Sequence, residues 1–182
     1  MDKRTEIRLA GEGGQGMILA GIILAEAAAI YDGKQVTQTQ SYGPEARGGA
    51  SRSEVVISEG QIDHPEVLSP DVVVALSQEA YQKFGKTVNS GGLLIVDADR
   101  VKTADNFRGI QIPVARLAQE TTGRTITANI VALGILVGLT DLVTRAAIEK
   151  AVTARAPKGT EEMNRKALQA GFAAAAQVRA AV

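Results

Sequence analysis

The sequence has 182 residues, the size of one domain with a substantial core. Its 20 Lys and Arg balance 20 Asp and Glu, and a formal net charge of +0 gives no electrostatic reason to expect nucleic acid or a membrane surface as a partner. Cysteine is absent, which excludes a disulfide framework, a thiolate-ligated iron–sulfur cluster and a cysteine nucleophile within this chain. The single histidine, His64, cannot form a histidine-rich metal site.

The start of the sequence gives no sign of secretion. Residues 1–5 are charged and run directly into a strand-like segment, without the hydrophobic region of a signal peptide. No apolar run reaches the roughly 18 residues that a bilayer-spanning helix needs. We therefore expect a cytoplasmic protein.

The first elements predict a strand, a glycine turn and a helix. Residues 6–10 (EIRLA) are strand-like, and residues 11–16 (GEGGQG) form the turn. Residues 15–31 are apolar nearly all round, as in a helix buried on most faces, and Gly33 can end that helix with a left-handed cap. This order is the opening of a βαβ unit.

The next elements predict a mixed sheet. Residues 35–40 (QVTQTQ) and residues 51–58 (SRSEVVIS) are β-prone and flank a loop at residues 41–49 (SYGPEARGG), as in a hairpin. Residues 71–76 and 93–96 are continuous apolar runs, typical of strands covered on both faces.

The remaining sequence is mostly helical. We expect a short helix at residues 77–84, a short strand at residues 109–112 with a helix after it, and a buried core helix at residues 129–139. Thr140 or Asp141 can cap the following helix.

A last helix opens near Thr160 and continues to the C-terminus. Strands that alternate with helices predict an α/β fold, here a single three-layer α/β/α domain over residues 1–182 with a mostly parallel, mixed sheet.

The glycine turn is the first candidate site. Closely spaced glycines after a strand let a ligand approach the backbone, and the following helix N-terminus offers N–H groups to a phosphate. The candidate cofactor contacts are Gly11, Gly13, Gly14, Gln15 and Gly16. The alternative is a tight turn that binds nothing.

A dinucleotide is a weaker interpretation of the same turn. Gly11, Gly13 and Gly16 fit GxGxxG, but that motif needs an acidic residue about 20 positions on, at the end of the second strand. Residues 36–40 end in Thr and Gln, and Asp32 precedes the strand.

The second candidate site is the loop SYGPEARGG. Arg47 beside Gly48 and Gly49 can grip an anion through its forked guanidinium and exposed backbone N–H groups. Tyr42 can either form a hydrogen bond with a ligand or close the core. The alternative is a solvated loop in which Arg47 pairs internally with Glu45.

Together the two motifs resemble a known family. GEGGQG after the first strand, followed about 30 residues later by SYGPEARGG, is similar to the γ subunit of 2-oxoacid:ferredoxin oxidoreductases. The resemblance continues through DVVVAL at residues 71–76, NIVALG at residues 129–134 and NRKALQAG at residues 164–171. It covers essentially the whole chain.

The resemblance implies a function that this chain shares with partners. The family decarboxylates a 2-oxoacid on thiamine diphosphate, passes electrons through iron–sulfur clusters to ferredoxin and releases acyl-coenzyme A. In the family, thiamine diphosphate, magnesium and the clusters belong to other subunits or domains, so we expect the isolated chain to be inactive. The partners that the resemblance implies are thiamine-binding α and β subunits, and in some complexes a ferredoxin-like δ subunit. The glycine turn and the Arg-Gly-Gly loop become candidates for contact with coenzyme A or with partner subunits. Overall resemblance favours 2-oxoglutarate over pyruvate as the 2-oxoacid.

Two other functions stay open: a stand-alone Rossmann-like dinucleotide-binding reductase, and a purely structural assembly module. The remaining polar residues are weaker candidates. Asp97 and Asp99 follow a strand and more often cap or turn than bind, His64 belongs to a loop, and Asn129 is a cap or a buried hydrogen-bonding group.

Overall fold

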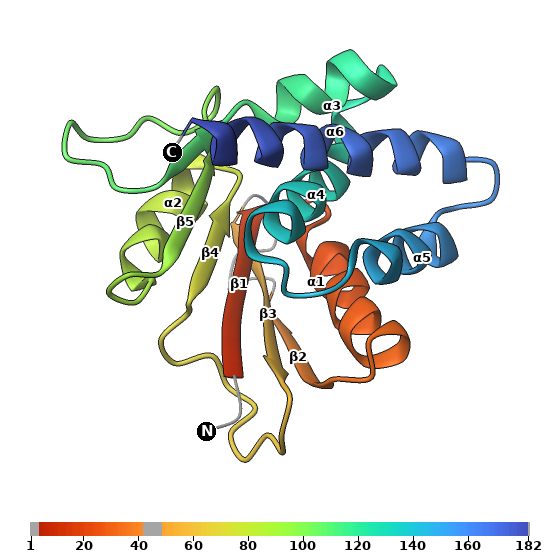
Figure 1. The fold of residues 1–182 in the computed structure, drawn as a ribbon. Coiled ribbons are helices and arrows are strands. Elements are labelled where there is room, and N and C mark those ends of the chain that lie inside the picture. The colour runs from red at the N-terminus through yellow and green to blue at the C-terminus, as the bar shows by residue number, and fades with distance from the viewer. Residues whose placement is uncertain (1–3, 42–48, 182) are drawn as a thin grey trace.

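The computed structural model describes residues 4–41 and 49–181 and has an α/β architecture (Figure 1). The strands are β1 (Arg4–Glu12), β2 (Gln35–Ser41), β3 (Ala50–Ser58), β4 (Val72–Ala75), β5 (Leu93–Asp97) and β6 (Ile110–Ile112). The α-helices are α1 (Met17–Glu26), α2 (Gln78–Phe84), α3 (Val114–Thr122), α4 (Ala128–Thr140), α5 (Arg145–Arg155) and α6 (Glu161–Ala180). Shorter helical turns are η1 (Ala27–Tyr31), η2 (Gly85–Thr87) and η3 (Thr125–Thr127).

The six strands form one mixed sheet in the order β2-β3-β1-β4-β5-β6. β1, β4, β5 and β6 run parallel to one another, whereas β3 is antiparallel to both β1 and β2. The expected mostly parallel, mixed sheet is confirmed. The β1–α1–β2 crossover connects two strands of the same direction, but β3 lies between them, so the expected βαβ unit is split by the hairpin.

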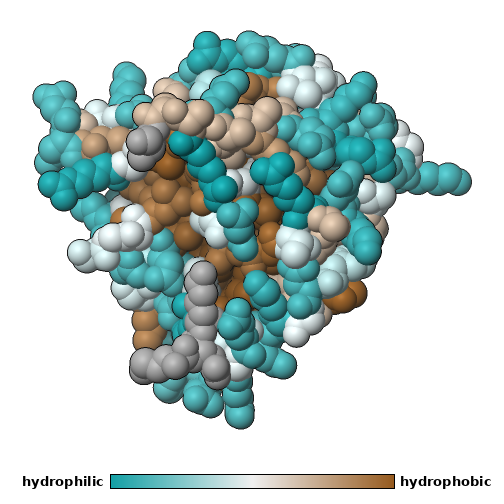
Figure 2. All heavy atoms as spheres, in the orientation of Figure 1, coloured by the Kyte–Doolittle hydropathy of each residue, from teal (hydrophilic) through white to brown (hydrophobic). Residues whose placement is uncertain are grey.

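The two faces of the sheet are covered unequally. Buried apolar side chains of α1, α4, α5 and α6 form the larger core cluster with one face of the strands. On the other face α2 supplies Ala80 and Phe84 to a smaller cluster with Ala10, Val73 and Val96. Figure 1 shows the long helix α6 lying across α4 with α2 on the far side of the strands. Figure 2 shows apolar atoms in the middle of the same view, framed by hydrophilic side chains.

Helices α4 and α6 approach each other closely at two glycines. A Cβ atom built on Gly134 would lie 2.9 Å from Gly171 Cα, and one built on Gly171 would lie 2.8 Å from Gly134 Cα. Real Cβ atoms essentially never approach another atom that closely. The two glycines therefore let the helix backbones touch, and α4 is buried along residues 128–138.

Two helix boundaries differ from the sequence expectations. α1 passes into a π-helical turn at Ala27–Tyr31, closed by the Asp32 N–H donating to the Ala27 carbonyl at 3.1 Å. The predicted cap at Thr140 or Asp141 is wrong, because the hydroxyl of Thr144 accepts from Ala147 N–H (3.1 Å) and starts α5. Thr140 instead donates to the Leu136 carbonyl within α4.

In the described part of the chain, no helix combines the length and the apolar character that a membrane crossing requires.

Candidate functional site

The glycine turn leaves the sheet at the carboxyl end of β1. Gly11 is still part of the strand, paired with Ser51 of β3, and the Ser51 hydroxyl donates to the Gly11 carbonyl at 3.2 Å. The next pair in the register is Glu12 with Ala50. The turn therefore begins beside the point where the second motif enters β3. Gly49, the last residue of that motif, is buried next to Ala50 in the chain.

Gln15 shapes the turn from within. Its Oε1 accepts from Glu12 N–H (2.7 Å) and its Nε2 donates to the Leu76 carbonyl at the end of β4 (3.3 Å). A Cβ atom on Gly11 would collide with this amide and lie 3.0 Å from Met17 Cγ. A side chain at position 11 would therefore displace the Gln15 amide, which holds the turn in shape.

Gly16 connects the turn to α1. It adopts the left-handed conformation (φ +72°), and a Cβ atom there would lie 2.6 Å from Asn129 Nδ2. The Asn129 amide donates to the Gly16 carbonyl (3.2 Å) and its oxygen accepts from Ile130 N–H (2.9 Å). Asn129 is therefore a buried hydrogen-bonding group, as expected, and fixes the start of α1 against α4.

Gly13 and Gly14 are different, because they are exposed at the tip of the turn. Gly14 needs glycine for its φ of +92°. Gly13 has no positive φ, and a Cβ atom there would meet no described atom within 4 Å. Nothing within the described chain requires glycine at position 13, so this position has room for an approaching ligand or partner.

A cavity of about 190 Å³ opens beside the turn. It lies at the carboxyl ends of the parallel strands, where open α/β sheets generally bind their ligands. Its lining comes from the turn, from the ends of β4 and β5 and from the α3–α4 region: Gly14, Gln15, Leu76, Asp97, Arg100, Ala115, Thr125, Ile126 and Ala128.

Asp97 is the acidic member of that lining, and it is occupied. It is 1% exposed, with Oδ1 accepting from Asp99 N–H (2.9 Å) and Oδ2 accepting from Ala115 N–H at the start of α3 (2.8 Å). Asp99 is exposed and pairs with Arg116 at 3.1 Å. Both aspartates thus have structural contacts.

Arg100 brings a positive charge to the cavity and was missed by the sequence reasoning. The sequence contains one indication of this location. Arg100 follows by three residues the end of the buried strand that closes with Asp97, and residues just after such strands often line a ligand site.

Three candidate residues of the second motif, Tyr42, Arg47 and Gly48, lie outside the described residues. The flanking residue Ala50 donates its N–H to Glu79 Oε1 of α2 at 3.1 Å. This bond holds the entry of β3 beside the first turn of α2, and so fixes where the motif rejoins the sheet.

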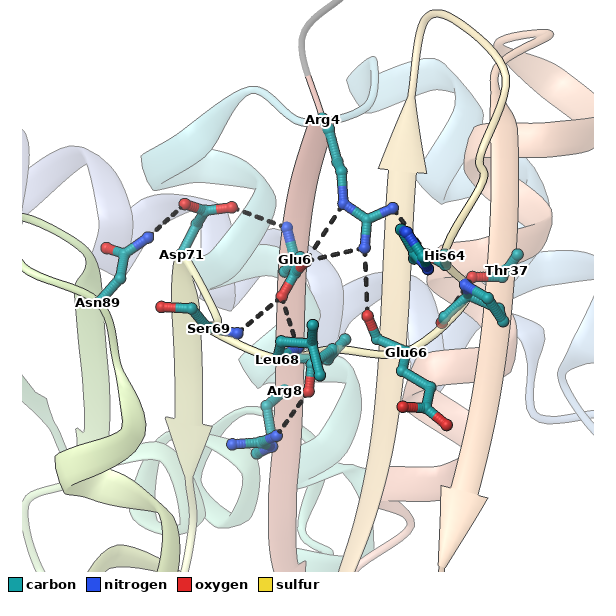
Figure 3. Close-up of polar contacts among 12 residues, drawn as sticks. Arg4, Glu6, Arg8, Thr37, His64, Glu66, Leu68, Ser69, Asp71 and Asn89 are labelled. Carbon is teal, nitrogen blue, oxygen red and sulfur yellow. Dashed lines mark hydrogen bonds and ion pairs between the residues drawn. The ribbon is translucent and has the colours of Figure 1, made fainter.

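The opposite end of β1 carries a dense polar network that is structural (Figure 3). Glu6 Oε2 accepts from the N–H groups of Leu68 and Ser69 at 2.8 and 2.9 Å, while Asp71 Oδ2 accepts from Glu6 N–H at 2.8 Å. Arg4 donates to the carbonyl of His64 at 2.8 Å. His64 is exposed in the connection between β3 and β4, as expected. The hydrogen bonds of the network attach this connection to the sheet.

No cluster of His, Cys, Asp and Glu that could hold a metal is found within residues 4–41 and 49–181. The fold also lacks the dinucleotide-binding arrangement. The neighbour of β1 on the β2 side is the antiparallel β3, so the strand whose end would carry an acidic ribose partner in a Rossmann unit is displaced to the sheet edge.

Comparison with known proteins places the chain in a family. The family model described as "Pyruvate ferredoxin/flavodoxin oxidoreductase" matches residues 6–174. A curated relative from Methanocaldococcus jannaschii, "2-oxoglutarate synthase subunit KorC", is 51% identical over 96% of this chain and 96% of its own length.

Two solved structures agree with this assignment. The γ subunit of a keto/oxoacid ferredoxin oxidoreductase from Geobacter sulfurreducens superposes with a TM-score of 0.87 and 50% identity, covering 96% of this chain and 98% of that one. The 2-oxoglutarate:ferredoxin oxidoreductase from Magnetococcus marinus, solved with 2-oxoglutarate, coenzyme A and succinyl-CoA bound, has a TM-score of 0.86 at 25% identity. The match covers 97% of this chain but 32% of that longer chain.

These matches extend over nearly the whole chain and confirm the resemblance seen in its two loop motifs. The chain therefore belongs to the pyruvate ferredoxin/flavodoxin oxidoreductase family and is a γ subunit of the 2-oxoacid:ferredoxin oxidoreductases.

Proposed function

We propose that this γ subunit serves a thiamine-dependent 2-oxoglutarate:ferredoxin oxidoreductase. The support for 2-oxoglutarate is the name of the relative that is 51% identical over nearly the full length of both chains. Thiamine diphosphate, magnesium and the iron–sulfur clusters reside on partner α, β and δ subunits, which agrees with a sequence that contains no cysteine. Ferredoxin receives its electrons from the assembled complex.

Within that complex, the glycine turn and the Arg-Gly-Gly loop form part of the coenzyme A surface. The observation that carries this proposal is Gly13, because no described contact explains why this exposed position is a glycine. The next residue, Gly14, lines a cavity that is also lined by Arg100. α1 begins directly below the turn at Gly16, where no described side chain caps it. Its first N–H groups and its positive dipole end suit the phosphates of coenzyme A.

The candidate residues would have different roles in binding coenzyme A. Gly13 and Gly14 give close access to the backbone, while Gly11, Gln15 and Gly16 hold the turn in shape. In the second loop, Arg47 supplies the charge-assisted grip, with Tyr42, Gly48 and Gly49 beside it in sequence.

The test is the Michaelis constant for coenzyme A in intact complexes that carry Arg47→Ala. Loss of one charge-assisted contact is worth roughly 1.5–3 kcal/mol, so the constant should rise about 10- to 150-fold. Arg47→Lys should recover part of the loss, because lysine lacks the planar fork.

Assembly must be checked separately, by gel filtration of the same complexes. If Arg47 only shapes its loop with Glu45, then Glu45→Ala and Arg47→Ala should both impair assembly. An unchanged Michaelis constant in a fully assembled Arg47→Ala complex would remove coenzyme A from this loop.

The isolated chain should not turn over substrate. A dye-reduction assay with 2-oxoglutarate, thiamine diphosphate, magnesium and coenzyme A should give no rate with this chain alone and a rate once the partner subunits are added. Turnover by the pure chain would refute its assignment as a dependent subunit.

A further inference from the structure

The strand β2 lies at an edge of the described sheet, and its own sequence carries none of the usual protection of a sheet edge. β2 has a sheet neighbour on one side only, β3, among the described strands. Its seven residues, QVTQTQS, include no charge, proline or glycine, and they pair with β3 without a break from Gln35↔Ser58 to Ser41↔Arg52. Natural proteins block open edges with lysine, proline, inward charges or bulges. β2 uses none of these devices.

An apolar groove of about 250 Å³ runs along this edge on the helix-covered side of the sheet. Its walls come from α1, the π-helical turn and β2: Ile22, Ala25, Glu26, Ala29, Ile30, Val36 and Gln38. The side chain of Ile30 is 66% exposed at this groove and adds to its apolar surface.

The polar members of the groove are already engaged. Arg155 Nε donates to both oxygens of Glu26 at 3.0 and 2.9 Å, and this hydrogen bond raises the pKa of the Arg155 guanidinium. The Gln38 amide donates to Ser53 Oγ at 2.8 Å, so it is turned toward β3, and to the Thr39 carbonyl at 3.2 Å. Edge and groove therefore form one continuous surface without an uncompensated charge.

We propose that a second copy of this chain docks here, with β2 pairing antiparallel to β2 of the copy around a two-fold axis. A two-fold contact brings the same patch of both chains together, so it must be self-complementary. An uncharged strand meets this condition, because no like charges face each other across the ladder. A partner with a charged edge would find no complementary charge on β2.

The geometry of such a pairing also accounts for the groove. With Gln38 near the axis, Val36 of one chain lies opposite Gln40 of the other, on the side of the sheet that α1 covers. α1 and the π-helical turn lie beside β2 on that side (Figure 1) and meet their copies across the axis. The exposed side chain of Ile30 then leaves water, and two six-stranded sheets become one continuous sheet. This inference is independent of the role proposed for coenzyme A.

Sedimentation equilibrium of the full chain tests the contact. The apparent mass should rise with concentration from 19.0 kDa toward twice that value. Ile30→Glu places like charges in the groove and should raise the dimer dissociation constant about 10-fold or more. The matched control is Ile126→Glu on η3, whose starting residue is 67% exposed, and it should leave the constant unchanged.

The strand itself is tested by a second pair of variants and by hydrogen exchange. Thr39→Lys adds the missing edge charge and should weaken the dimer, whereas Gln111→Lys on the other edge strand, β6, should not. Exchange at residues 35–41 should slow as the dimer forms, while exchange at residues 110–112 stays constant. A strictly monomeric chain, a dimer equally sensitive to Ile126→Glu, or a dimer without added protection of β2 would each overturn the proposal.

Discussion

Glycines in two regions of this chain have opposite surroundings. At the α4–α6 crossing, Gly134 and Gly171 are buried against each other's backbone, and each would force a Cβ atom to within 2.9 Å of the other's Cα. At the tip of the first turn, Gly13 faces open space and has no positive φ. Packing requires glycine at the helix crossing. At position 13, at the tip of the turn, neither a described contact nor the backbone conformation requires it.

The difference separates stability from function. A glycine required by its own chain should cost stability when it is replaced, whereas a glycine required by a ligand should cost binding alone. A graded series of Gly→Ala changes from the crossing to the turn tests whether this separation is real.

The largest loss of stability is expected for Gly134→Ala. The new methyl group would meet the backbone of α6, which cannot move without shifting a buried helix, and overpacking of this kind costs about 3 kcal/mol. Urea unfolding should show that loss, and the melting temperature should fall by about 6–12 °C. A change no larger than that of Gly13→Ala in the same assay would end the contrast between the two regions.

Gly16→Ala should be the next most damaging. Its alanine must adopt a φ of +72° and displace Asn129 Nδ2, which together should cost about 2 kcal/mol. Gly33→Ala is the matched control, because Gly33 has a φ of +67° and would meet no described atom within 4 Å. It should lose about 1 kcal/mol from backbone strain alone, and equal losses at the two positions would show that the Asn129 contact is unimportant.

Gly11→Ala should have a smaller effect. The obstructing atoms belong mainly to the flexible amide of Gln15, which can move but then gives up its bonds to Glu12 N–H and the Leu76 carbonyl. Losing these bonds at a partly exposed site should cost about 1 kcal/mol. Gln15→Ala should reproduce most of that loss and make Gly11→Ala nearly neutral in the double variant, as measured by chemical unfolding.

Much of the fold could be predicted because hydrophobic continuity marks buried elements. The apolar runs that became β4 and β5, and the helix α4, were located to within a residue or two. The start of α5 could not be located in this way. Thr140, Asp141 and Thr144 are all good capping types, and the choice depends on Asp32, which accepts from the N–H and the hydroxyl of Thr144 at 2.7 Å from a segment 112 residues away.

The candidate site was predictable in part for a similar reason. Glycine spacing after a strand identifies a turn that a ligand can approach, and the pairing of two such motifs identified the family. Spacing does not distinguish Gly11 and Gly16, which pack against Gln15 and Asn129, from Gly13, which packs against nothing described. The charge of Arg100 reaches the same cavity only because β5 lies next to β4 in the folded sheet.

The most direct test of the account is Gly13→Ala in the assembled complex. The variant should unfold at the same denaturant concentration as the wild type and assemble normally, because its methyl group meets no described atom of its own chain. The Michaelis constant for coenzyme A should nevertheless rise about 10-fold or more, the equivalent of roughly 1.4 kcal/mol. A Gly13→Ala complex with wild-type stability and an unchanged Michaelis constant would contradict the claim that this turn meets coenzyme A.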